Sequence, residues 1–207
     1  MLGALVILLA VVQIDSPYPA VAPLHHIPTL VLIVSAPFLL RRYPLSTAAI
    51  AAVVVFFALH TVGGRYTYTN VPYDDWATDL FGRSLSDITG WSRNHYDRLV
   101  HLAYGLLAVL PTREFLRRHL GIGDRLALYI AIESVIAVSA VYELFEWGLS
   151  IVLAGPLAND YNGQQGDVWD AQKDMALATL GALAAATAIR AFRPSAAAAG
   201  SGSAASS

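Results

Sequence analysis

Long apolar segments constrain the fold of this chain more than any other feature of its sequence. Of its 207 residues, 56% are hydrophobic and only 14% are charged, whereas a soluble domain carries roughly 25% charged residues. The apolar residues are gathered into blocks that approach the ~20 residues a helix needs to cross a bilayer. The sequence therefore predicts an all-α fold, a polytopic bundle of membrane helices.

About six transmembrane helices follow from these blocks and the polar breaks between them. A signal peptide is the alternative for the first, short block, but no Lys or Arg precedes it and no cleavage site is convincing, so we favour a short membrane helix. We assign residues 1–193 to one transmembrane domain and the Ala-, Ser- and Gly-rich residues 194–207 to a disordered tail. The third of these helices is predicted to break at Gly63 and Gly64. The predicted helices cover residues 2–14, 27–40, 45–59, 96–116, 124–153 and 167–192.

The arginines predict the orientation in the membrane. If six helices alternate, eight of the thirteen Lys and Arg residues fall on one side, which the positive-inside rule assigns to the cytoplasm. Both termini are then cytoplasmic, and the polar segments 61–95 and 154–168 lie at the outer face. The eight residues are Arg41, Arg42, Arg113, Arg117, Arg118, Arg125, Arg190 and Arg193.

Composition also excludes several classes of function. The net charge of −2 offers no basic surface for nucleic acid. The chain has no Cys, so it forms no disulfide, uses no thiolate nucleophile and can bind a metal only through residues such as His and carboxylates. No phosphate-binding loop or dinucleotide motif occurs.

The densest polar group lies at the entrance of the fourth predicted helix. Asp97 and His101 are four residues apart and therefore share a face, and a carboxylate one turn from a His can orient it as a general base or a metal ligand. An ionisable side chain inside an apolar helix is costly and marks function by default. For Asn94 and Tyr96, helix capping and interfacial anchoring are the alternatives.

Acidic residues on the fifth and sixth helices complete the pattern. Glu143 and Glu146 share a face and suit a metal, a shared proton, or ion pairs with arginines of the fourth helix. Asp167, Asp170 and Asp174 have the spacing of a single stripe on the sixth helix, where the macrodipole favours acids in the first turn. Glu133 stands apart without a visible partner, so a proton path and a helix contact both remain open for it.

Together these segments predict one polar site at the outer face. Tyr66 and Tyr68 would point the same way if their segment is extended, and would flank a bound head group. A divalent metal ion is the candidate cofactor, and a membrane lipid the candidate partner. The predicted catalytic residues are His101, Asp97, Glu143, Glu146 and Asp174. The predicted substrate-binding residues are Arg93, Asn94, His95, Arg98, Tyr66, Tyr68 and Gln165. The predicted metal ligands are His60, Asp167 and Asp170.

Four motifs in order resemble the YjdF-type family of bacterial inner-membrane proteins, over about residues 45–190. They are His60 to Tyr68, Arg93 to His101, Tyr142 to Trp147, and Gln165 to Met175. The resemblance implies a multi-pass protein of the bacterial cytoplasmic membrane and supplies no chemistry, because the family is of uncharacterised function. The chain is also more weakly similar to VanZ-like membrane proteins, with Arg98 in place of a Lys and Glu146 in place of a Gln. That similarity implies lipid-linked or envelope substrates.

Three functions are compatible with these residues. The leading prediction is a membrane enzyme that acts at the outer leaflet on a lipid or lipid-linked head group, by phosphoryl or phosphodiester chemistry. A proton- or cation-coupled transporter is the second, although no internal repeat is seen and the polar groups gather at one face. The third is a non-catalytic envelope assembly protein, whose polar cluster would pair off completely and leave no pocket.

Overall fold

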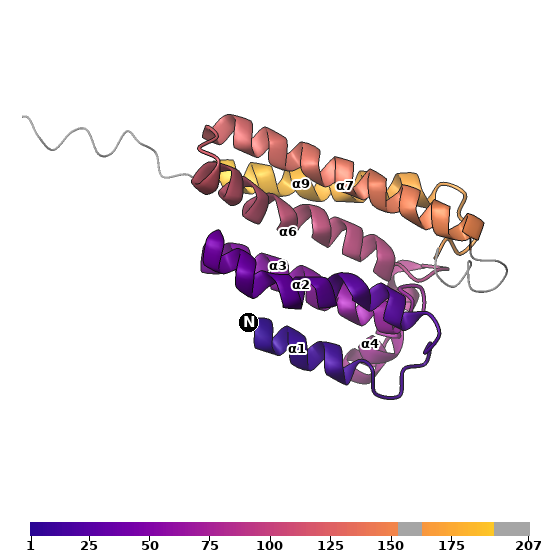
Figure 1. The fold of residues 1–207 in the computed structure, drawn as a ribbon. Helices are drawn as coiled ribbons and strands as arrows, with labels where there is room; N and C mark the ends of the chain where they lie inside the picture. The colour runs from indigo at the N-terminus through magenta and orange to yellow at the C-terminus, as the bar shows by residue number, and fades with distance from the viewer. Residues whose placement is uncertain (153–162, 193–207) are drawn as a thin grey trace, which may run out of the picture.

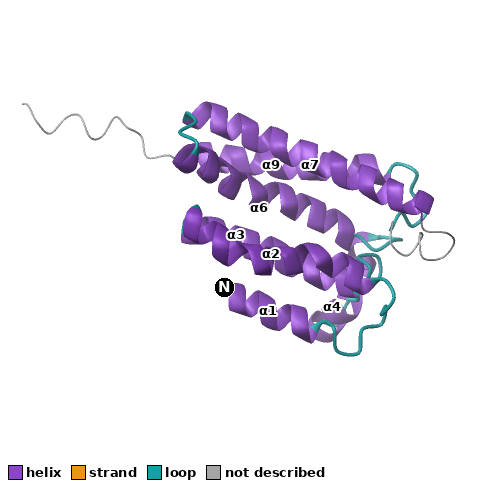
Figure 2. Ribbon diagram, viewed as in Figure 1, coloured by secondary structure: helices purple, strands orange, loops and turns teal. Residues whose placement is uncertain are grey.

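The computed structural model describes residues 1–152 and 163–192, and every regular element in these ranges is a helix (Figure 2). Five helices are long and apolar enough to cross a membrane, and α1 is a shorter apolar helix. The predicted all-α, polytopic bundle is thus confirmed, with α1, only 10 residues long, in place of the first predicted span. The predicted tail lies outside the described residues. The helices are α1 (Leu2–Val11), α2 (Ala22–Arg42), α3 (Thr47–Arg65), α4 (Tyr73–Phe81), α5 (Leu85–Thr89), α6 (Tyr96–His119), α7 (Asp124–Val152) and α9 (Asp170–Ala191).

The long helices alternate in direction along the chain, so the N-terminus and the end of α9 lie at the same end of the bundle (Figure 1). Helices α1, α2 and α3 contact one another, as do α6, α7 and α9, and contacts between α3 and α6 join the two groups. The short helices α4 and α5 lie at the opposite end, which we call the polar end. Which end faces the cytoplasm stays a prediction from the arginines.

Two predicted helix boundaries were wrong, one because Pro is accepted in the first turn of a helix and one because Gly can lie inside a helix at a close contact. Helix α2 begins at Ala22 rather than Ile27, since Pro23 stands in the first turn, where its missing N–H costs nothing. Helix α3 continues through Gly63 and Gly64, where a break was predicted. A Cβ at Gly64 would lie 2.8 Å from the Cβ of His25. This glycine therefore permits close helix packing rather than ending the helix.

The tyrosine segment is a turn, so the extended backbone on which the shared direction of Tyr66 and Tyr68 depended is not present. Thr67 and Tyr68 have φ angles of 52° and 58°, and the N–H of Tyr68 donates to the carbonyl of Gly63 over 2.8 Å. The turn sends the Tyr68 side chain back into the bundle, where it is buried and its hydroxyl contacts Nδ1 of His60. Tyr66 instead packs against the ring of Trp76.

The sixth predicted helix also begins later than expected. Helix α9 starts at Asp170, so Asp167 does not belong to a helical stripe with Asp170 and Asp174. Asp167 lies in the preceding turn, where its carboxylate accepts a hydrogen bond from the N–H of Trp169 over 3.1 Å. This local bond to the backbone competes with helix formation and explains the shorter helix.

Helices α6 and α9 approach so closely that their backbones touch. A Cβ added to Gly105 would lie 2.0 Å from the carbonyl oxygen of Ala178, and one added to Gly181 would lie 2.3 Å from that of Leu102. Ala178 and Ala182 are fully buried in the same contact. Small residues that allow such approach are the usual interface of membrane helices. Both helices start at the polar end, so residues one turn before this contact face each other (Figure 1).

We expect Gly105→Ala to destabilise the protein by roughly 1–3 kcal/mol, the cost of overpacking a tight interface, because the obstructing atoms belong to the backbone of α9. Thermal unfolding of the detergent-solubilised protein measures this. The matched control is Gly148→Ala on α7, where an added Cβ meets no atom within 4 Å. Equal melting temperatures for the two variants would contradict the close contact.

Candidate functional site

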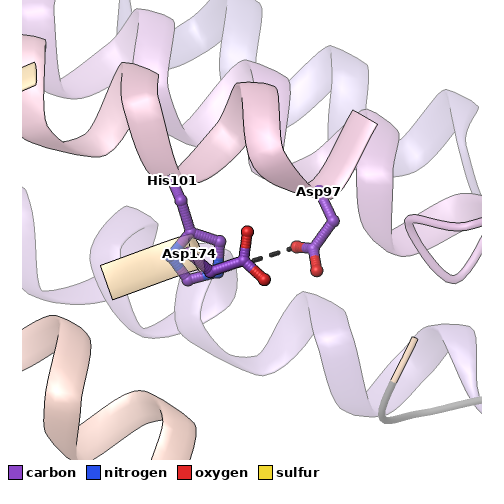
Figure 3. A group of neighbouring side chains, drawn as sticks. All are labelled: Asp97, His101 and Asp174. Carbon is purple, nitrogen blue, oxygen red and sulfur yellow. Dashed lines mark ion pairs between the residues drawn. The ribbon is translucent and has the colours of Figure 1, made fainter. Parts of the chain in front are cut away.

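The predicted catalytic residues converge from three helices near the polar end. Asp97 and His101 come from α6, Glu143 from α7 and Asp174 from α9. Nε2 of His101 lies 3.7 Å from Oδ1 of Asp97 and 3.4 Å from Oε1 of Glu143. Figure 3 shows the side chains of Asp97, His101 and Asp174 pointing toward one another. Glu146 is buried one turn further along α7.

This acidic cluster is deeply buried and only partly satisfied. Asp174 is 2% exposed and His101 7% exposed. Oδ1 of Asp174 and Oε1 of Glu143 accept no hydrogen bond from any described residue. A buried charge is costly unless it is paired or hydrogen-bonded. The cluster therefore holds polar groups that the described part of the chain does not neutralise.

The nearby arginines form ion pairs with acidic residues outside this cluster. Arg93 lies 2.8 Å from Asp170, and Arg98 lies 2.7 Å from Asp167 and 3.2 Å from Asp170. Lys173 adds a 2.5 Å contact to Asp167. These bonds tie the entrance of α6 to the start of α9. The arginines thus pair with Asp167 and Asp170 rather than with Glu143 and Glu146.

Three predicted substrate-binding residues join the loops of the polar end. The N–H of Asn94 donates to Oε1 of Gln165, and Nε2 of Gln165 donates back to the carbonyl of Asn94, both over 2.9 Å. Nδ2 of Asn94 donates to the carbonyl of Val71, and the N–H of His95 donates to the hydroxyl of Tyr73. These bonds are structural, and a role in binding stays a prediction for these residues.

The structure does not bring together the predicted metal ligands His60, Asp167 and Asp170. Nε2 of His60 lies 2.8 Å from the carbonyl oxygen of His25, and Tyr68 occupies Nδ1, so both ring nitrogens are engaged. Asp167 and Asp170 are held in the ion pairs with the arginines. Within residues 1–152 and 163–192, the group with ligand atoms close enough for one ion is Asp97, His101 and Asp174.

A cavity of about 610 Å³ runs along α6, between α3 and α7. At the polar end its walls include His60, Tyr68, Asp97 and His101, and the rest of the lining is largely apolar and reaches Phe115. From Asp97 to Phe115, α6 rises ~27 Å at 1.5 Å per residue. The volume is typical of a ligand pocket.

This cavity could not be predicted from the sequence, because apolar residues that face lipid, core or a cavity are of the same types. Glu133 is exposed on α7 and does not line the cavity. No polar series from Asp174 to Glu133 is thus seen in the described chain, which removes one observation that would favour a transporter.

Lowering the pH should reduce the stability of the folded protein through protonation of His95. Burial of its imidazole, together with the adjacent Arg98 and Arg93, lowers the pKa of His95 below its ordinary value. The unfolded chain then binds this proton more readily than the folded one, so stability is lost as pH falls below about 6.5. We expect His95→Gln to flatten the decline of the melting temperature between about pH 7 and pH 5. Parallel declines in the variant and the unchanged protein would contradict this assignment.

Comparison with known proteins agrees with the membrane fold. The family described as predicted membrane protein (DUF2238) matches residues 1–195. The inner membrane protein YjdF of Escherichia coli is 38% identical over 144 residues, which cover 69% of this chain and 65% of that relative. No solved structure matches. Like this relative, the chain is a protein of the bacterial inner membrane, and its five helices long enough to cross a membrane make it multi-pass. It belongs to the DUF2238 family of membrane proteins.

Proposed function

We propose that this chain is a membrane enzyme that acts on the head group of a lipid or lipid-linked substrate, by hydrolysis or transfer at a phosphoryl or phosphodiester bond. The observation that carries the proposal is the cavity, whose apolar walls lead to Asp97 and His101. A substrate with an apolar chain and a reactive polar head matches both parts of this cavity.

The position of the cavity among membrane-spanning helices indicates what kind of molecule would fill it. The backbones of α3 and α7 do not contact each other within the described residues, and α6 forms the wall between them. Among membrane-spanning helices the surrounding solvent is hydrocarbon, which fills an apolar hollow more readily than water does. The ~27 Å of α6 along the cavity approaches the ~30 Å thickness of the hydrocarbon core. These features support a lipid chain as occupant.

The polar end of the cavity offers acid–base groups to a head group. An imidazole with two carboxylates within 4 Å can exchange a proton with a reacting oxygen. Arg93 and Arg98 lie at the same end, and beyond their ion pairs with Asp167 and Asp170 a guanidinium group keeps further N–H donors that suit a phosphate. A purely structural cluster would pair its charges completely and leave no cavity. Oδ1 of Asp174, which accepts no hydrogen bond from any described residue, argues against that alternative.

Filling the cavity should displace the lipid. We expect Val53→Trp, whose side chain would enter the cavity, to lower the lipid retained after purification by about tenfold, which corresponds to ~1.4 kcal/mol of binding free energy. Native mass spectrometry of the detergent-solubilised protein measures the retained lipid. The control is Val55→Trp on the exposed side of the same helix. Equal retention in both variants would count against the cavity as the lipid site.

Changing the acid–base group should abolish turnover and spare lipid binding. The assay uses vesicles of E. coli polar lipids, with and without a polyprenyl phosphate, and follows the head groups by mass spectrometry. We expect His101→Gln to slow head-group conversion by about 10²-fold or more while lipid retention stays unchanged. No conversion by the unchanged protein with either lipid, or equal conversion by the variant, would overturn the proposed function.

A further inference from the structure

We infer that Asp97, His101 and Asp174 bind a divalent transition-metal ion, with Glu143 beside it to accept a proton from a metal-bound water. The role of this ion in a reaction rests on the proposed function, whereas its binding is argued from the side-chain cluster alone. The inference assigns His101 as a ligand and moves the role of general base to Glu143.

The charge balance of the cluster favours a bound cation. Asp97, Glu143, Glu146 and Asp174 have no Arg or Lys nitrogen within 4 Å among the described residues. Three cations of the polar end, Arg93, Arg98 and Lys173, form ion pairs with Asp167 and Asp170 instead. His101 alone cannot offset several carboxylates buried in an apolar bundle. A divalent cation would supply the missing positive charge at this point.

The distances among the three side chains also suit a single ion. One ligand atom each from Asp97, His101 and Asp174 lies within 4.8 Å of the others. An ion that binds nitrogen and oxygen at ~2.0–2.2 Å holds opposite ligands up to ~4.4 Å apart, so small side-chain rotations suffice. Asp97 and His101 are one helical turn apart on α6 (Figure 3). The third ligand comes from α9, whose backbone touches α6.

A buried carboxylate oxygen without a hydrogen-bond partner also points to an ion, independently of the ligand spacing. Asp174 is 2% exposed, and its Oδ1 has no hydrogen-bond partner in the described chain although its side chain points toward Asp97 and His101 (Figure 3). Native proteins rarely bury such an atom without a partner, because the lost solvation is not repaid. An ion at this point supplies the partner. Oε1 of Glu143 likewise accepts no hydrogen bond from a described residue, and it lies at ion-pair distance, 3.4 Å, from Nε2 of His101.

The ligand types indicate the class of metal. An imidazole with carboxylates suits zinc or manganese, whereas magnesium and calcium favour oxygen ligands throughout. In the proposed reaction, water on the ion gives one proton to Glu143, and its oxygen forms a bond to phosphorus. The bond from phosphorus to the leaving oxygen breaks as that oxygen takes up the proton from Glu143. Atoms and charge balance without any further reactant.

The test measures metal content and stability in the full chain. We expect about one Zn²⁺ or Mn²⁺ per purified, detergent-solubilised molecule by elemental mass spectrometry, and a melting temperature that falls on chelation and recovers when the ion is restored, since an ion that binds only the folded state stabilises it. Asp174→Asn and Asp97→Asn should each lower the content at least about tenfold and remove the effect of the chelator. The matched control is Asp170→Asn, which breaks the ion pairs to the arginines. It should lower the melting temperature while the metal content stays unchanged.

Two results would overturn the inference. The first is an unchanged protein that contains no metal and shows no shift in melting temperature with added Zn²⁺ or Mn²⁺. The second is full metal content in a folded Asp174→Asn variant. Lipid retention measured on the same samples separates this inference from the proposed function. Lipid without metal would refute the ion alone, and metal without lipid or head-group conversion would refute the enzyme alone.

Discussion

The backbone contact between α6 and α9 is the interaction on which the rest of this structure depends. Gly105 and Gly181 allow the helices to touch, because any Cβ at either position would collide with the partner backbone. In a bilayer, where apolar burial does not drive helices together, this close packing is a main source of association. Since both helices start at the polar end, the contact also fixes their register. It places Asp174 near His101, each one turn before the contact of Gly105 with Ala178.

That register divides the acids of the polar end into two sets with different surroundings. Asp167 and Asp170 form ion pairs with Arg93, Arg98 and Lys173. These ion pairs join the entrance of α6 to the start of α9. Asp174, with the acids on α6 and α7, is left deeper in the bundle without a Lys or Arg partner in the described chain. The cavity between α3 and α7 ends at this second set. This apolar cavity, which leads to acids without a Lys or Arg partner among the described residues, is the basis of the proposal of lipid chemistry.

Much of this arrangement was predictable from the sequence, because the period and length of the apolar blocks determine the helices, and alternation of six helices brings the polar loops to one end. The pairing of Asp97 with His101 followed from their spacing alone. The partners of the arginines did not, since they depend on how three helices pack. Gly64 was interpreted as a helix break because a glycine that permits close packing looks the same in sequence. The inward direction of the Tyr68 side chain was not predicted, because a left-handed turn in non-glycine residues leaves no signal in the sequence.

The central claim is that α6 and α9 bring His101 and Asp174 face to face inside the bundle. The chain has no Cys, so the double variant His101→Cys with Asp174→Cys can be probed in native membranes with a short thiol cross-linker. Helix packing as described predicts efficient cross-linking in this variant, and none when Asp174→Cys is combined with Glu133→Cys, whose position faces outward. Cross-linking of the second pair, or none of the first, would contradict the arrangement from which the site was built.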